Sequence, residues 1–478
     1  MVVALFVIPL LFAAVAFLSP SARLRPLLVP IAGGLHLALV VATLWRGGDI
    51  SAFDGWIVID KLGRIALPLI SVLFFLCSLY LPTYLRLRAE RPHRVFCSSL
   101  LAFLAMMSLS ISSHQLGLMW VAIEATTLAS VPLLFFNENS RSLEATWKYL
   151  LVGGVGIALA LLGTFFLAYA GVQGGVKASL LLEDLLRDAP LLSRTWLHTA
   201  FIVLFVGYGT KMGLAPMHTW KPDAYGEAPG IVGALLAGGL TTCAFVAVLR
   251  CYQVCAAAGD GDFARELMVT MGLLSMTVAG VFMARQRDYK RMLAYSSVEH
   301  MGILVLGIGL GGLAAYGALL HLINNALTKG ALFIAAANIH RAYRSKTTDM
   351  VSGALRRVPA SGILLLAGFF AATGSPPFGP FLSEFTIARS AVADSHFVVA
   401  GMFLVLLFVV FVGMGSTVLA VVQGTPPEDL EDTGFRDGLG TVGPALALLL
   451  AVLVLGVWVP SGLDAALRDA AVFVETGR

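Results

Sequence analysis

The sequence predicts an all-α polytopic membrane protein with about fourteen transmembrane helices. Two observations lead to this fold class. The 478 residues are 58% hydrophobic and only 13% charged, whereas soluble globular chains carry about 25% charged residues. Apolar runs of about 20 residues, the length that crosses a bilayer, also follow one another along the chain. A soluble globular domain of this length is therefore excluded.

The predicted spans are, in order, residues 1–19, 27–46, 64–86, 94–112, 115–136, 142–170, 196–225, 229–253, 264–285, 293–313, 315–341, 356–394, 397–423 and 440–460. The alternating stretch FDGWIVIDKL between spans two and three predicts a short hairpin strand outside the bilayer. Residues 171–195 predict a glycine turn with an interfacial amphipathic helix, and residues 461–478 predict an amphipathic tail helix.

Spans seven and twelve are over-long and interrupted, by KMGLAP and by TGSPPFGP. Paired broken helices five spans apart indicate inverted repeats and point to an ion site. The predicted organisation is helices 1–3 in residues 1–93, a first five-helix repeat in 94–255, a second, inverted repeat in 256–425, and helix 14 with its tail in 426–478.

The lysines and arginines predict that both termini lie outside. Inside loops of membrane proteins carry the excess of basic residues, and here that excess comes mainly from RLRAERPHR, ARQRDYKR and HRAYRSK. The first apolar run has no basic segment before it, and Arg23 and Arg25 follow it. It is therefore interpreted as a retained span and not as a cleaved signal peptide.

Charged side chains inside the predicted spans are the candidate functional residues, because each costs about 2.5–3.5 kcal/mol at mid-bilayer. Glu124 lies near the middle of span five, Lys211 lies beside the first break, and Glu384 follows the second. The simpler interpretations are a packing carboxylate for Glu124, a lysine that reaches the interface for Lys211, and an interfacial carboxylate for Glu384. Carbonyls freed by Pro216 favour a solvated ion path at Lys211.

His321, Asn325 and Lys329 are spaced i, i+4 and i+8, which places all three on one helix face. One such residue would usually be a helix–helix contact, but a stripe of three favours a hydrated path. His300 begins span ten and is either a proton site or an interfacial residue. Three residues near span ends could line an entrance or lie in solvated loops: His114, His218 and Glu227.

A row of Glu, Lys, His, Lys and Glu side chains suits proton translocation, because burial disfavours the charged form of each. Redox chemistry would need a cofactor site, and the sequence has no Walker A loop, no Cys-x-x-Cys and no haem pair. The five cysteines are interpreted as small buried residues. We therefore expect no cofactor and no metal in this subunit, and the net charge of +4 gives no indication of nucleic acid.

Four motifs together resemble one known family: KMGLAPMHTWKPDAYGEAP, ARQRDYKRMLAYSSVEHMG, HLINNALTKGALFIAAANI and PPFGPFLSEF. They are similar to the antiporter-like subunits of respiratory complex I, membrane-bound hydrogenases and Mrp antiporters, over roughly residues 55–425. SSVEHMGI and NNALTKGALF look most like hydrogenase 4 component F and formate hydrogenlyase-type subunits. The resemblance implies fourteen helices, two inverted five-helix repeats and ion pumping driven by a redox partner.

By position, the resemblance makes Glu124 the glutamate of the fifth helix and Lys211 the lysine of the broken seventh, a coupling pair. It makes Lys329 the lysine of the eleventh helix and Glu384 the terminal proton site. One departure stands out. Thr242 occupies the place of the lysine that many complex I members carry on the eighth helix. The relay would then run through water, His321 or His300.

The expected function is that of a non-catalytic, proton- or sodium-translocating subunit of a redox-driven complex, such as a group 4 hydrogenase or a complex I-like enzyme. Its expected partners are other membrane subunits and a soluble hydrogenase or dehydrogenase module, in a bacterial or archaeal cytoplasmic (inner) membrane. The alternatives are a subunit of an Mrp-type cation/proton antiporter, a stand-alone antiporter, a subunit for inorganic-carbon uptake, and a quinone-binding catalytic subunit. No quinone headgroup pocket is recognisable in the sequence.

Overall fold

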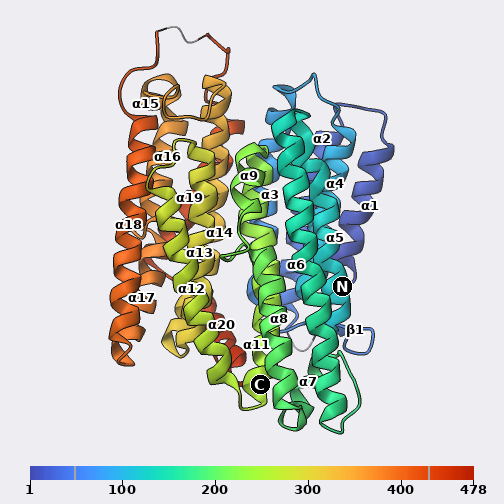
Figure 1. The fold of residues 1–478 in the computed structure, drawn as a ribbon. Coiled ribbons are helices and arrows are strands. Elements are labelled where there is room, and N and C mark those ends of the chain that lie inside the picture. The colour runs from blue at the N-terminus through green and yellow to red at the C-terminus, as the bar shows by residue number, and fades with distance from the viewer. Residues whose placement is uncertain (48–49, 429–430, 478) are drawn as a thin grey trace.

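The computed structural model describes residues 1–47, 50–428 and 431–477 and is almost entirely helical (Figure 1). The first half contains α1 (Ala4–Leu18), α2 (Arg25–Trp45), α3 (Gly63–Arg86), α4 (Arg94–Ser112), α5 (Leu116–Leu134), α6 (Ser140–Gln173), α7 (Leu182–Asp188), α8 (Arg194–Met212), α9 (Trp220–Glu227), α10 (Gly230–Leu235) and α11 (Thr241–Ala257). The second half contains α12 (Gly261–Met283), α13 (Tyr289–Leu310), α14 (Leu313–Tyr343), α15 (Ala354–Arg357), α16 (Pro359–Ala372), α17 (Gly379–Ala393), α18 (Phe397–Val422), α19 (Leu439–Val457) and α20 (Ser461–Thr476).

Within the described residues, 11 helices are long and apolar enough to cross a membrane, if the continuous segment Gly230–Ala257 is taken as one. The shorter helices α1 and α16 are apolar as well. The predicted all-α membrane fold is thus confirmed, while the count of fourteen spans and the division into two inverted repeats stay predictions. A short π-helical stretch, Leu236–Leu240, joins α10 to α11.

Both predicted breaks are present. α8 ends at Met212 and α9 begins at Trp220, while α16 ends at Ala372 and α17 begins at Gly379. Gly213 closes α8 with a φ of +85°, a left-handed conformation that favours glycine. Any Cβ there would also meet the Cε atom of Lys221 at 2.3 Å. The first break therefore needs glycine for both backbone and space.

The predicted extramembrane elements are also present. Strands β1 (Ile50–Ala52) and β2 (Ile57–Ile59) pair antiparallel. This hairpin, α7 and the C-terminal helix α20 lie at the lower end of the bundle in Figure 1. The connections at the other end contain α15 and the basic segments after α3 and α14. Basic segments that the sequence analysis assigned to the inside loops thus lie at the end opposite the hairpin.

The centre of the bundle is formed by α14 and by the continuous segment Gly230–Ala257. Every residue in the most apolar stretch of α14, and in that of Gly230–Ala257, is buried. α14 packs against α13, α16, α17 and α19. By contrast, only 28% of the equivalent stretch of α18 is buried, and side chains such as Val398 and Phe408 point outward. Outer helices thus present apolar side chains to lipid, and polar ones gather inside.

Candidate functional site

A row of buried polar side chains crosses the middle of the bundle, from α5 and α8 at one end of the row to α17 at the other. Figure 1 shows these helices on opposite sides of the bundle. We call this row the relay and define it by nine residues: Glu124, Thr127, Lys211, Lys221, Glu299, His300, His321, Lys329 and Glu384. Glu124 is partly buried and the other eight are buried. The relay contains all six residues predicted for proton translocation, and it adds three that the sequence analysis did not select.

The predicted pair of Glu124 and Lys211 is linked through a hydroxyl group. Lys211, fully buried at the end of α8, donates from its ammonium to the Thr127 hydroxyl. The same hydroxyl donates to the Glu124 carboxylate, over 3.0 Å. Lys211 also donates to the Tyr149 hydroxyl at 3.2 Å and lies over that ring at 4.6 Å from its centroid. Thr127 can serve both charges because a hydroxyl donates once and accepts twice.

Lys221 is the most informative residue that the sequence analysis missed. It follows the first break within predicted span seven, and α9 places it in the core with no solvent exposure. Its ammonium donates to the Ser297 hydroxyl at 3.1 Å. A lysine within a predicted span was the available signal, and the same argument had already selected Lys211.

Lys329 contacts α13 at Ser296, the residue beside the Ser297 that Lys221 contacts. Its ammonium donates to the Ser296 hydroxyl at 2.6 Å, so the two buried lysines of α9 and α14 contact adjacent serines. Glu299 lies one turn further along α13 and interacts electrostatically with Lys329. The polar stripe of α14 is buried, and α13 provides partners for two of its three residues, His321 and Lys329.

Two histidines continue the relay toward α17. The Nδ1 atom of His300 and the Nε2 atom of His321 are 2.9 Å apart, and His321 Nδ1 lies 2.9 Å from the Ser383 hydroxyl. That hydroxyl donates to the Pro380 carbonyl, so it accepts from His321. His321 Nε2 then accepts from His300 when both rings are neutral. Glu384, the next residue after Ser383, is buried on the same helix.

Several buried polar atoms along the relay have no hydrogen-bond partner in the protein. Among the described residues they include Glu299 Oε2, His300 Nε2 and Glu384 Oε1. Both amide atoms of Asn324 and the Oδ1 atom of Asn325 also lack a partner. Buried polar groups are nearly always hydrogen-bonded, and ordered water is the usual alternative partner. Their concentration around α13, α14 and α17 indicates a hydrated region.

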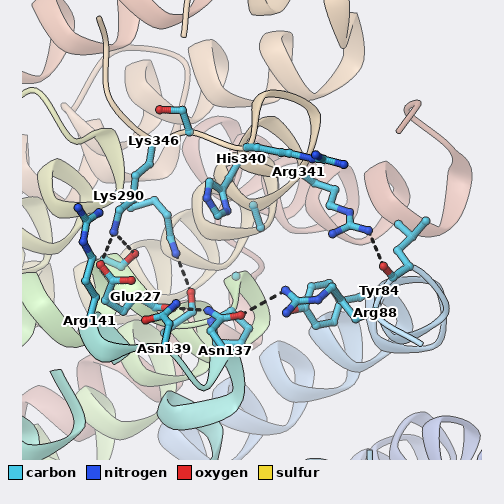
Figure 2. A pocket seen from close by; sticks show the side chains of 18 of the residues that line it. Tyr84, Arg88, Asn137, Asn139, Arg141, Glu227, Lys290, His340, Arg341 and Lys346 are labelled. Carbon is cyan, nitrogen blue, oxygen red and sulfur yellow. Dashed lines mark hydrogen bonds and ion pairs between the residues drawn. The ribbon is translucent and has the colours of Figure 1, made fainter. Parts of the chain in front are cut away.

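The three predicted entrance residues lie in different places. His218 lies within the first break, beside the rings of Phe282 and Tyr295. Glu227 lines a cavity of about 630 Å³ at the upper end of the bundle. Figure 2 shows it beside Lys346, whose ammonium is 2.5 Å from the Glu227 carboxylate. His114 lies at the opposite end, at a second cavity of about 630 Å³.

The sequence around the relay matches a known protein family. Residues 113–411 match the family described as NADH:quinone oxidoreductase/Mrp antiporter, TM. This match includes every relay residue. The chain belongs to that family. The predicted resemblance and the predicted antiporter-like membrane subunit are therefore confirmed.

Individual members of the NADH:quinone oxidoreductase/Mrp antiporter family are also similar to this chain in sequence or in fold. The hydrogenase-4 component F homolog of Methylacidiphilum infernorum (isolate V4) is 35% identical over 412 residues, 84% of this chain and 85% of that protein. NADH-quinone oxidoreductase subunit N of Desulforudis audaxviator (strain MP104C) is 30% identical over 391 residues, 77% of each chain. A chain of the Mrp complex from Dietzia sp. DQ12-45-1b superimposes with a TM-score of 0.89 and shares the fold at 20% identity, over 100% of this chain and 97% of that one.

A second buried charge cluster lies at the hairpin end of this family member. Fully buried Arg250 donates to the Asp60 carboxylate at 3.2 Å and to the carbonyls of Ile111 and Ser113. His114 Nε2 lies 3.0 Å from the same carboxylate. Burial alone would raise the pKa of Asp60, but Arg250 and His114 hold that pKa well below its ordinary value. The cluster joins the hairpin to α4 and α11.

We expect Asp60→Asn to destabilise the protein at pH 7 by about 3–5 kcal/mol, because it leaves the buried Arg250 charge without a partner. Thermal unfolding in detergent would show this with a maleimide dye, because the five cysteine thiols are free and buried. Glu431→Gln is the control, since its pair with Arg344 is exposed and should contribute little.

The difference in unfolding free energy between wild type and Asp60→Asn should depend on pH. Asp60 has a lowered pKa in the folded state, so its contribution to stability is complete above the unfolded value, about 3.9. That contribution is lost as the pH falls through the folded value. The gap between wild type and Asp60→Asn should therefore stay constant from about pH 5 to 8 and narrow in stronger acid. A gap that narrows toward pH 8 would contradict this assignment.

Proposed function

We propose that the chain moves protons across the membrane as one subunit of a larger, redox-driven complex. The observation that carries this proposal is the relay, which places nine ionisable or hydroxyl side chains in the buried centre of an apolar bundle. Buried ionisable groups in a membrane are costly and usually functional. Their neighbours without protein partners support a hydrated route between them.

The chemistry of the relay favours protons over sodium. Three of its members are buried lysines, Lys211, Lys221 and Lys329. An ammonium group has three hydrogen-bond donors and no acceptor, so it repels a sodium ion but can hand on a proton. The hydrogen bond between His300 and His321 has the same property, since an imidazole can take up a proton at one nitrogen and release another from the second.

The order of the contacts gives the proposed route. Glu124 and Lys211 form the coupling unit through Thr127. Lys221 then takes the place of the lysine that Thr242 replaces on the eighth helix, and it hands the proton on toward Lys329 across the serine pair of α13. The last part of the route consists of three residues, His300, His321 and Glu384, with Glu384 as the terminal exchange site.

The kind of complex is inferred from the relatives. The names of the two relatives above describe a hydrogenase component and a subunit of a quinone oxidoreductase. We therefore propose other membrane subunits and a soluble hydrogenase-type module as partners, with no cofactor in this chain. The basic end of the bundle would face the cytoplasm across the inner membrane, which places both termini outside.

The experiment that tests this function begins with the intact assembly. The chain is tagged in the cells that make it, and the complex is purified and analysed by mass spectrometry for co-purifying subunits. The complex is then reconstituted into liposomes that contain a pH-sensitive dye. We expect redox subunits and substrate-driven proton movement. Purification without redox subunits, together with sodium/proton exchange by the isolated chain, would instead establish an antiporter.

We expect Thr127→Val to reduce proton movement strongly, because valine has the shape of threonine but cannot bridge Lys211 to Glu124. The loss should be about 10²-fold, the lower end of what a proton-transfer group contributes. Thr127→Ser is the matched control and should retain most of the rate, since it keeps the hydroxyl. Equal rates in the valine and serine variants would show that the hydroxyl bridge is not used.

A further inference from the structure

Three possible metal ligands converge where the relay reaches α17. One ligand atom each from His300, His321 and Glu384 lies within 4.8 Å of the others, and all three residues are buried. They come from α13, α14 and α17, so only the folded bundle brings them together. We propose that this cluster binds one Zn²⁺ ion, which occupies the relay in place of a proton. Only the ion's route of entry rests on the proposed function.

The donor set suits zinc. Two imidazole nitrogens and one carboxylate oxygen form a recognised set of three protein ligands, which leaves a fourth position for water. In a tetrahedral site with bonds of about 2.0–2.2 Å, ligand atoms are about 3.3 Å apart. The imidazoles of His300 and His321 already approach to 2.9 Å, so an ion would separate them slightly while Glu384 turns toward them.

The surroundings orient the ligands as they do in zinc sites. His321 donates from Nδ1 to the Ser383 hydroxyl, so its Nε2 lone pair faces His300 and could coordinate an ion that replaces their hydrogen bond. Such a hydrogen bond fixes the tautomer of a metal-binding histidine and strengthens its donor nitrogen. Ser383 is itself held by its bond to the Pro380 carbonyl. The second layer of the site is thus already in place.

Two of the three candidate ligands have unused hydrogen-bonding capacity. His300 Nε2 and Glu384 Oε1 are buried without a protein partner. Beside the Glu384 carboxylate lies Gly374, where an added Cβ would come within 2.0 Å of Oε2. The carboxylate thus occupies space that only glycine at position 374 leaves open. An ion here would give the Glu384 carboxylate a partner that the protein itself does not provide.

The charged groups that face the cluster predict how its Zn²⁺ affinity changes with pH and with the removal of a lysine. Glu299 and Lys329 interact with Glu384, and Lys221 and Lys329 both act on His300. The carboxylates favour a cation and the two ammonium groups oppose it. Zn²⁺ also needs its ligands deprotonated. Affinity should therefore rise with pH, and Lys329→Met should bind the ion more tightly than the wild type does.

The test measures zinc bound to the full chain in detergent, by equilibrium dialysis against buffered Zn²⁺ and elemental analysis. We expect one tight ion per wild-type chain, lost in His300→Gln, His321→Gln and Glu384→Gln. His198→Gln is the matched control because His198 Nε2 also lies near a carboxylate, 3.3 Å from Asp260, outside the cluster. X-ray absorption at the zinc edge should show two imidazole ligands. A wild type that binds no more ion than the Glu384 variant overturns the proposal.

Two further measurements separate loss of the zinc site from misfolding and from failure of the proposed function. Ser383→Ala keeps all three ligands and should weaken binding about 10- to 100-fold, as loss of a second-layer hydrogen bond does. Unchanged affinity in that variant counts against the site as described. If His321→Gln stops proton movement but the wild type binds no zinc, the metal site fails and the relay stands. If zinc fills the site and proton movement continues unchanged, the site stands and the route through the histidines fails.

Discussion

Replacing Lys211 by methionine is expected to abolish substrate-driven proton movement while the complex still assembles. Methionine fills the same buried space without a charge, so the end of α8 should pack as before. The ammonium that contacts Thr127 and Tyr149 is lost, however, and the coupling unit then has no proton to pass. Glu124→Gln should have the same effect from the other side of the Thr127 bridge.

The measurement is the initial rate of internal pH change in liposomes that contain the assembled complex, with subunit composition checked by mass spectrometry. Lys177→Met is the control, because Lys177 is an exposed lysine outside the relay. A wild-type rate in an assembled Lys211→Met complex would rule out the coupling unit.

The second large effect is expected at Lys221. Lys221→Met should lower proton movement by about 10²-fold or more, the order by which loss of a proton-transfer group slows a reaction. The reason is positional: Lys221 and Lys329 meet the adjacent serines of α13, and without Lys221 the two ends of the relay are separated. The redox reaction should continue if it is measured with an uncoupler present. The same liposome assay compares the variant with wild type.

A second variant tests the position of this lysine without removing it. Gly213→Ala adds a Cβ that would meet Lys221 Cε at 2.3 Å, on a backbone with a φ of +85°. Displacement of Lys221 should therefore slow proton movement in this variant as well. Gly175→Ala is the matched control, since Gly175 has a φ of +77° and nothing near an added Cβ. Normal proton movement in an assembled Lys221→Met complex would show that the proton passes elsewhere.

Much of the fold could be predicted from local sequence because its signals are local. Apolar runs predict spans, and the breaks follow from the glycine and proline residues around Gly213 and Pro377. The β-hairpin was likewise visible in the alternation of FDGWIVIDKL. The i, i+4, i+8 stripe of α14 also needs only helix geometry, so its shared face could be predicted with no knowledge of the neighbouring helices.

The parts of the site that could not be predicted depend on contacts between distant segments. Nothing near Glu124 in sequence shows that Thr127 will hold Lys211, 84 residues away. The sequence analysis did not select Lys221, because only tertiary packing shows that α9 places it in the core after the break. The entrance role of His114 stays a prediction, and its bond to Asp60, 54 residues away, could not be read from the local sequence.

The hydrogen bonds from His300 through His321 to Ser383 and Pro380 all point the same way. A proton that enters at His300 and leaves beyond His321 reverses each hydrogen bond that it crosses, because every group gives up the hydrogen it held and keeps the one it receives. The chain cannot carry a second proton in that direction until both rings and the hydroxyl have been reset. On the proposed route, this stretch would therefore pass one proton per cycle, and the return of the two rings to their starting tautomers would have to precede the next transfer.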